Sequence, residues 1–216
     1  MAGGGGDDIY IISNPADRVI EQASGGIDEV RTNVGYTLPE NVENLSVHTA
    51  DLQPGQGNAL IGNSLDNRIT GAAFTKADIL GLDGDDVLEG TGRFGGNLDG
   101  GNGNDTLINT IGESRGGPGA DLFVAAGRLA HTAPDVPMTV LDFNPQDGDR
   151  IDGGFLGSGS DPAALFASGN LQFDAANQRL IFTRNPAAFA TTPSAVDQII
   201  LLPGLDSFDP TWIVPR

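Results

Sequence analysis

The chain has 216 residues, of which 38% are hydrophobic, and this is enough to fill the core of at least one domain. Its formal net charge of −18 at pH 7 argues against nucleic acid and anionic membrane surfaces as partners, because both would repel it, and favours cations. Cysteine is absent, which excludes disulfides and thiolate metal sites, and no apolar run approaches the ~18 residues of a transmembrane segment.

Glycine and lysine depart most from ordinary usage. Glycine accounts for 32 residues, about twice the usual share of ~7%. Lys76 is the only lysine, so the acids are not interleaved with ammonium groups as on a salt-bridged surface. Turns and strands are therefore favoured over helices, and many carboxylates must be solvated or neutralised by something outside the sequence.

The N-terminal region alternates short apolar runs with turn residues, a pattern that predicts strands of three to six residues. The expected strands cover residues 9–12, 18–20, 28–34, 36–38 and 42–47.

A nine-residue period runs from Gln53 to Val124. Its frames are QPGQGNALI (53–61), GNSLDNRIT (62–70), GLDGDDVLE (81–89), TGRFGGNLD (91–99), GGNGNDTLI (100–108) and GGPGADLFV (116–124). Two further stretches are irregular: AFTKADILG (73–81) fits only at its Asp and Leu, and NTIGESR (109–115) is two residues short.

The eighth position of every frame is apolar: Leu60, Ile69, Leu88, Leu98, Leu107 and Phe123. Six turn residues followed by three extended ones, with one side chain pointing inward, predict a coil of very short strands. Two nonapeptides would make one turn of the coil, and successive turns must stack as parallel strands to bury a core.

Stacking would bring the sixth-position residues Asp86, Asp105 and Asp121 above one another. Two charges at ~4 Å repel by ~1 kcal/mol in water, and by more in a partly buried site. A hard divalent cation held by carboxylate and carbonyl oxygens would relieve this, and calcium tolerates irregular oxygen shells better than magnesium. Glycine readily takes the positive φ values that turn several carbonyls toward one point.

After about Ala125 the composition changes. TAPDVP (132–137) is typical of a linker, and PAALFAS (162–168) is the one stretch that favours a helical turn. The expected strands cover residues 138–143, 170–173, 179–183 and 197–202, with a last apolar segment at 211–214. Such a unit would close the open end of the coil.

The repeat residues resemble a known family. GGNGNDTLI and GGPGADLFV match the GGxGxDxUx unit of the hemolysin-type calcium-binding (RTX) repeats of proteins exported by bacterial type I secretion. GGGGDDIYI (3–11) fits the same unit, and GLDGDDVLE departs from it only at Leu82. Residues 7–47 resemble a sequence that separates repeat blocks in that family, and DFNPQDGDRID (142–152) resembles the strand and turn after the last repeat.

The resemblance implies an all-β fold, a parallel β-roll that holds several calcium ions (Ca²⁺) between stacked turns, with flanking short strands and a C-terminal β-rich cap. The expected parts are a partial repeat with an inter-repeat segment (1–52), the roll (53–124) and the capping region (125–216). The implied metal ligands are carboxylates and backbone carbonyls of Asp8, Gly81, Asp83, Gly84, Asp86, Gly100, Gly101, Asn102, Gly103, Asp105, Gly116, Gly117, Gly119 and Asp121.

Placing alternate repeats on alternate ridges gives one ridge of Asn67, Asp86, Asp105 and Asp121, and a second of Asn58, Asp78, Gly96 and Ser114. We expect calcium chiefly on the first ridge, between Asp86 and Asp105 and between Asp105 and Asp121. Asp147, Asp149 and Asp152 form either a further site or a solvated turn.

The function that the resemblance implies is a secreted, calcium-binding module that folds on calcium after passing the type I secretion machinery and that stabilises or carries an exoprotein. FDPTWIV (208–214) resembles the ending of the uncleaved C-terminal export signals of that family, although any short terminal strand would look similar. The chain opens inside a repeat, so we expect a catalytic or other effector domain to lie before residue 1 and this chain itself not to be an enzyme.

Two alternatives stay open. An accessory module that binds carbohydrate or a cell surface, like the repeat modules of mannuronan epimerases, would show a basic or aromatic stripe, for which Arg68, Arg93 and Arg115 are the only hints. A hydrolase would use Ser114 of the G-x-S-x-G match at 112–116, with His131 downstream, but the repeat lacks the strand-turn-helix context of that motif. HExxH is absent, which excludes that zinc protease site.

Overall fold

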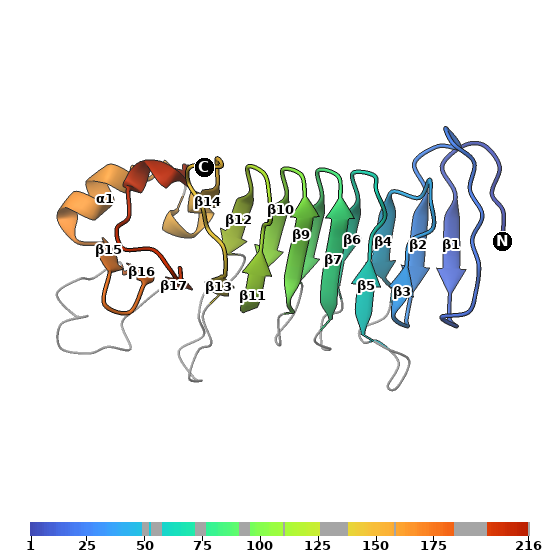
Figure 1. Ribbon diagram of the computed structural model, residues 1–216, viewed down its shortest axis with the longest axis horizontal. Coiled ribbons are helices and arrows are strands. Elements are labelled where there is room, and N and C mark those ends of the chain that lie inside the picture. The colour runs from blue at the N-terminus through green and yellow to red at the C-terminus, as the bar shows by residue number, and fades with distance from the viewer. Residues whose placement is uncertain are drawn as a thin grey trace.

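The computed structural model describes residues 1–48, 52, 58–71, 77–90, 96–109, 111–125, 138–157, 159–183 and 198–215. These residues form short strands side by side in one long row, with the N-terminus at one end of the row and a helix at the other (Figure 1). The protein is therefore almost entirely β, as the sequence predicts.

The strands form two sheets. The first sheet contains, in spatial order, β1 (Ile9–Ile12), β2 (Glu29–Thr32), β4 (Asn44–Val47), β6 (Arg68–Thr70), β8 (Val87–Gly90), β10 (Thr106–Asn109), β12 (Leu122–Ala125), β14 (Arg150–Asp152) and β18 (Ile213–Val214). The second contains β15 (Leu171–Asp174), β16 (Arg179–Phe182), β17 (Gln198–Leu201), β13 (Met138–Val140), β11 (Gly112–Arg115), β9 (Leu98–Asn102), β7 (Asp78–Asp83), β5 (Ala59–Ile61) and β3 (Tyr36–Thr37).

From β2 to β14 the chain alternates between the two sheets, strand by strand, and each strand pairs in parallel with the strand one coil further on. Residues above one another in β6, β8 and β10 are 19 positions apart, one more than two nonapeptides would give. The next coil has 16 residues, because the short frame at 109–115 closes it. The shorter coil is therefore the one that contains the frame with two residues missing.

The core lies between the two sheets. All six apolar residues at the eighth repeat position are buried, with exposed fractions between 0 and 2%: Leu60, Ile69, Leu88, Leu98, Leu107 and Phe123. Each strand from β5 to β12 contributes only one or two inward residues, so no coil there has a core of its own and stacking supplies it.

The N-terminal strands agree with prediction except at residues 18–20. There the chain makes only an isolated parallel bridge between Ala2 and Ile20, because Asp17 and Arg18 interrupt the alternation of apolar residues. Strand β4 pairs with β6, so the first sheet continues without a break from the N-terminal region into the repeats. The expected boundaries at residues 52 and 124 stay predictions.

The described residues of the C-terminal region include helix α1 (Pro162–Ser168), the 3-10 helices η1 (Gly153–Leu156) and η3 (Pro210–Trp212), and the antiparallel strands β15 to β17. The Asp161 side chain accepts from the Ala163 N–H and Gly169 ends the helix in the left-handed conformation, which explains why so short a helix forms. Strand β13 pairs with β17, so this unit extends the second sheet at the far end of the row (Figure 1). The apolar segment at 211–214 forms part of η3 and β18.

Leu82 is strained. It stands level with Gly101 in the paired strands and has a φ of 87°, a value that L-residues rarely adopt. Glycines of the later repeats take such angles without a side chain, for instance Gly101 at 106° and Gly117 at 98°. The one departure of the frame at 81–89 from the repeat unit therefore costs conformational energy.

Leu82→Gly should stabilise the folded chain. Removing the Cβ relieves about 1–2 kcal/mol of strain, and the extra freedom of glycine in the unfolded chain offsets about 0.5–1 kcal/mol of it. We expect a net gain of up to about 1 kcal/mol in urea unfolding. Leu122→Gly in β12, whose φ is not positive, is the control and should destabilise. A lower unfolding midpoint for Leu82→Gly would contradict this account.

Candidate metal centre

A column of polar side chains runs across the first sheet, at the N-terminal ends of its strands. Each member is the residue immediately before a strand, and the parallel register places successive members side by side. We call this set the acidic column: Asp8, Asp28, Glu43, Asn67, Asp86, Asp105, Asp121 and Asp149. Strand spacing is ~4.8 Å, so the column brings carboxylates of neighbouring coils close together.

Backbone hydrogen bonds hold the column in place. The Asp86 N–H donates to Asp105 Oδ1 at 2.8 Å, the Asp105 N–H to Asp121 Oδ1 at 2.8 Å, and the Asp121 N–H to Asp149 Oδ1 at 3.0 Å. At the other end the Asn67 N–H donates to Asp86 Oδ1 at 2.7 Å. One oxygen of each central carboxylate is thus fixed by the coil before it.

The second oxygen of each central carboxylate has no partner. Asp86, Asp105 and Asp121 are each 1% exposed, and their Oδ2 atoms receive no hydrogen bond. A buried carboxylate oxygen without a donor or a cation is costly. The three Oδ2 atoms therefore mark positions that require either a proton or a positive ion.

Burial raises the pKa of these three carboxyl groups. Loss of solvent, followed by smaller contributions from neighbouring acids, raises the pKa of Asp86 and Asp121 to about 7 and that of Asp105 to about 6. Burial also raises the pKa of Asp149. Near neutral pH, protonation can thus relieve the column only in part.

Glycine carbonyls face the same positions. A methyl group on Gly81 would overlap both Asp86 Oδ2 and the carbonyl oxygen of Gly100 in the next coil. A methyl group on Gly100 would likewise overlap Asp105 Oδ2 and lie 2.7 Å from the Gly116 carbonyl oxygen. Glycine is required here because the carboxylate and the carbonyl occupy the space of a side chain, and this arrangement brings two oxygens together.

The remaining sequence-predicted ligands lie around this core of the site. Five of them are turn glycines with positive φ: Gly84, Gly101, Gly103, Gly117 and Gly119. The side chains of Asp83 and Asn102 are exposed, and Asn102 Nδ2 donates to Asp83 Oδ1 at 2.7 Å, so they bond to each other rather than join the acidic column. Gly116 lies beside Asp121 as Gly100 lies beside Asp105. Asp8 begins the column.

Asp28 and Glu43 were not predicted as members of the column, and Asp149 was not distinguished from Asp147 and Asp152. All three directly precede a strand, which is the signal that could have found them. Asp149 extends the column beyond Asp121, so Asp121 is not its last member. Asp147 instead accepts from Asn144 Nδ2, and Asp152 caps η1 through the Gly154 N–H.

The residues expected on the second ridge are not level with one another in the paired strands. Asp78 stands level with Ala59, and Ser114 with Leu98, so Asn58, Asp78, Gly96 and Ser114 do not form a column. The expectation was wrong because the irregular frames at 73–81 and 109–115 shift the sequence count relative to the strands. Residues 53–57, 72–76 and 91–95 of that edge lie outside the described residues.

The position of Ser114 does not suit a catalytic nucleophile. It points into the core from β11, is 0% exposed, and its Oγ accepts from Asn109 Nδ2 at 3.3 Å. It takes an inward position that the other coils fill with an apolar residue. His131 lies outside the described residues.

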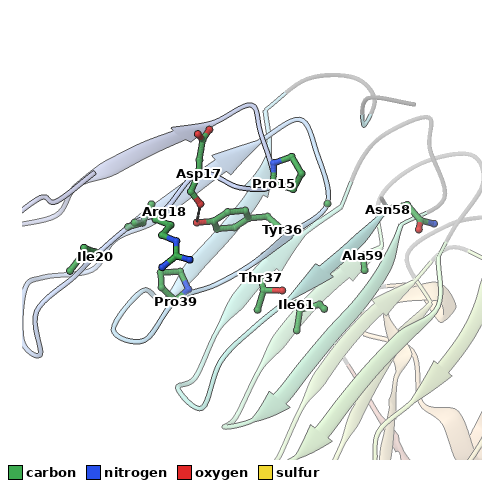
Figure 2. Close-up of a pocket in the computed structure, with 12 residues that line it drawn as sticks. Pro15, Asp17, Arg18, Ile20, Tyr36, Thr37, Pro39, Asn58, Ala59 and Ile61 are labelled. Carbon is green, nitrogen blue, oxygen red and sulfur yellow. Dashed lines mark hydrogen bonds between the residues drawn. The ribbon is translucent and has the colours of Figure 1, made fainter. Parts of the chain in front are cut away.

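A groove lies at the N-terminal half of the second sheet. It has a volume of about 690 Å³ and is lined by Asp17, Arg18, Tyr36, Thr37 and Asn58 among others (Figure 2). The Tyr36 hydroxyl donates to the Asp17 carbonyl at 3.2 Å and fixes the ring in the wall.

The described residues do not form the arginine stripe that the carbohydrate-binding alternative would show. Arg68 pairs with Glu89 at 3.2 Å and Arg115 lies 3.8 Å from Asp142, while Arg93 is outside the described residues. None of the described helices is long and apolar enough to cross a membrane.

Two β-glycanases of Rhizobium meliloti (strain 1021) resemble part of the chain. Endo-1,3-1,4-beta-glycanase ExsH is 42% identical over 76 residues, which is 35% of this chain and 15% of the glycanase. Endo-1,3-1,4-beta-glycanase EglC is 42% identical over 71 residues, or 33% of this chain and 14% of the glycanase. The chain thus covers less than a sixth of either relative. No protein-family model matches the chain.

Without metal, the folded chain should lose stability as the pH rises. The pKa of Asp86, Asp105 and Asp121 is about 7, 6 and 7 in the folded chain against an ordinary 3.8, so the folded state binds protons more tightly than the unfolded state. Their contribution is fully present below about pH 4 and is lost as the pH rises to about 7. Circular dichroism with a chelator at pH 5 and pH 8 measures this: the strand signal should be stronger at pH 5, and a stronger signal at pH 8 would contradict it.

Proposed function

We propose that the chain is a calcium-binding RTX module, a parallel β-roll that folds when calcium binds between its stacked turns. The observation that carries the proposal is the set of three buried Oδ2 atoms without partners in the acidic column, each beside a glycine of the turn. Carboxylate and carbonyl oxygens are the donors that calcium prefers. The residues present therefore fit the ion.

The sites would lie chiefly between Asp86 and Asp105 and between Asp105 and Asp121, with carbonyls of Gly81, Gly100 and Gly116 as further donors. Calcium supplies the positive charge that lets neighbouring carboxylates stay ionised. The chain's own part is to hold one oxygen of each carboxylate through a backbone N–H and leave the other free. The inward leucines alone do not remove the repulsion.

The calcium requirement would serve secretion. Extracellular calcium modules work at ~10⁻⁴–10⁻³ M, well above the calcium level inside a cell, and binding free energy becomes folding free energy where the site does not exist in the unfolded chain. The module would stay unfolded inside the bacterium, pass the type I secretion machinery and fold outside. It would then stabilise or carry an exoprotein, and its likeness to two glycanases supports an effector of that enzyme class.

Calcium titration followed by circular dichroism tests the proposal. The wild-type chain should gain strand signal between chelator and millimolar calcium, and unchanged spectra would refute the proposal. Asp105→Asn keeps the Oδ1 acceptor but removes the charge, so its calcium midpoint should rise by at least about tenfold. Asp85→Asn, an exposed neighbour in the preceding coil, removes the same charge and should leave the midpoint almost unchanged.

A second candidate function is binding of a β-glucan in the groove beside Tyr36. The groove and the two glycanase relatives favour it. A tyrosine, an arginine and hydroxyl and amide groups are suitable partners for a sugar chain, since they offer an apolar face with hydrogen-bond donors.

Affinity electrophoresis in gels that contain 1,3-1,4-β-glucan tests this second function. The wild-type chain should be retarded, and Arg18→Ala in the groove should reduce the retardation. Arg68→Ala, whose side chain lies outside the groove, is the control and should migrate like wild type. Equal mobility of the wild-type chain with and without glucan would exclude this function.

A further inference from the structure

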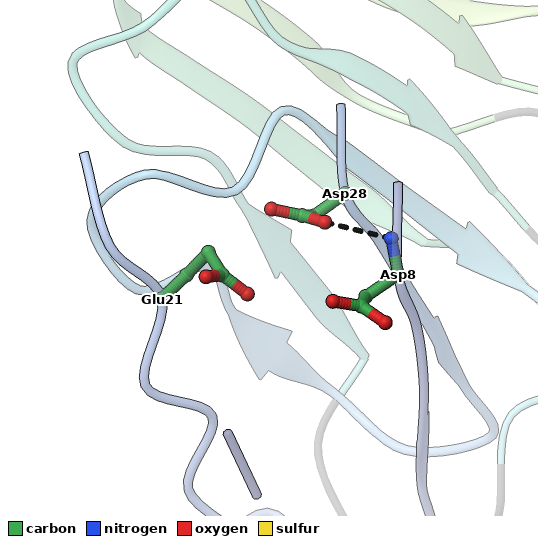
Figure 3. Close-up of side chains that lie close together, drawn as sticks. All are labelled: Asp8, Glu21 and Asp28. Atoms are coloured by element: carbon green, nitrogen blue, oxygen red, sulfur yellow. Dashed lines mark hydrogen bonds between the residues drawn. The ribbon is translucent and has the colours of Figure 1, made fainter. Parts of the chain in front are cut away.

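A separate cluster of three acids lies at the N-terminal end of the row of strands. Asp8 precedes β1, Asp28 precedes β2, and Glu21 comes from the irregular segment between these strands. The three carboxylate groups face one another, and a ligand atom of each lies within 4.8 Å of those of the other two (Figure 3). Glu21 is not part of any nonapeptide frame.

Asp28 supplies the independent observation that points to an ion. Its side chain is 0% exposed, Oδ1 accepts from the Asp8 N–H at 2.8 Å, and Oδ2 has no partner. In the described part of the chain, every ion pair joins other acids to arginine, so no cation of the protein neutralises this cluster. Three carboxylates with one buried and unpaired oxygen require an external positive charge.

Glu21 is held in position for this purpose. The Tyr10 hydroxyl donates to Glu21 Oε2, and the Gln22 N–H donates to Oε1 at 2.8 Å. Tyr10 is itself a core residue of β1 at 5% exposure, so packing fixes the group that orients the carboxylate. The glycine that follows also matters, because a methyl group on Gly25 would lie 2.7 Å from Glu21 Oε1.

We propose that Asp8, Glu21 and Asp28 form a further cation site, beyond those proposed from Asp86 to Asp121, that fastens the segment between β1 and β2 onto the first coil. An all-carboxylate donor set selects a hard divalent ion, with calcium preferred because it accepts irregular oxygen geometry. Gly3 lies beside Asp8 Oδ2 as Gly81 lies beside Asp86 Oδ2, and Glu21 adds a third carboxylate at this end. This site goes beyond the proposed function, since it requires no ion between Asp86 and Asp121.

Crystals of the wild-type chain grown with terbium, which replaces calcium at oxygen sites, give the most direct test. We expect an anomalous-scattering peak in contact with Asp8, Glu21 and Asp28. Peaks confined to the Asp86–Asp105–Asp121 stretch would overturn this inference while supporting the proposed function, and a peak at the cluster alone would do the reverse.

Tyrosine-sensitised terbium luminescence tests the site in solution, because Tyr10 contacts Glu21 and would transfer energy to a bound ion. Glu21→Gln should raise the terbium concentration for half-maximal emission at least tenfold, and Glu40→Gln, an exposed acid, should not. Asp105→Asn should keep this emission. Full tyrosine-sensitised emission at the wild-type midpoint in Glu21→Gln would overturn the inference, and circular dichroism confirms that each variant is folded.

Discussion

Buried carboxylates repeated at the strand spacing are the constraint on which the rest of the structure depends. The parallel register places a carboxylate before each strand of the first sheet except β6 and β18, and from Asn67 to Asp121 the backbone N–H of each residue holds an oxygen of the next carboxylate. The same contacts that align the coils thus gather negative charge. A fold of this kind is stable only when a proton or a cation occupies the other oxygen.

The hydrophobic core does not remove the need to neutralise these carboxylates, because each coil buries few apolar side chains. Each coil contributes a few inward side chains, and they become buried only when coils stack. Stacking in turn brings the carboxylates together. Core burial and charge neutralisation are therefore coupled, and under the proposed function a change in calcium concentration or pH would act on the whole row of coils rather than on one site.

The two ends of the row differ in how they are closed. At the C-terminal end, β15 to β17 and α1 extend the second sheet, and Phe123, Phe143 and Trp212 pack ring against ring over the last coils. At the N-terminal end, a polar segment that contains Glu21 crosses the first coil. An apolar cap needs no ligand, whereas buried acids need a positive charge, and this difference is the physical basis for the cation site proposed there.

The sequence by itself determined the β class, the inward residues from Leu60 to Phe123, and the alignment of Asp86, Asp105 and Asp121, because each follows from a local nine-residue period. Only the tertiary structure decided the register of the irregular frames, which moved Asp78 and Ser114 away from the positions that counting gives. It also decided that Asp28, Glu43 and Asp149 join the same column, since they belong to segments without the period. Counting residues fixes a position only while every loop has the same length, whereas hydrogen bonds between strands fix it whatever the loop length.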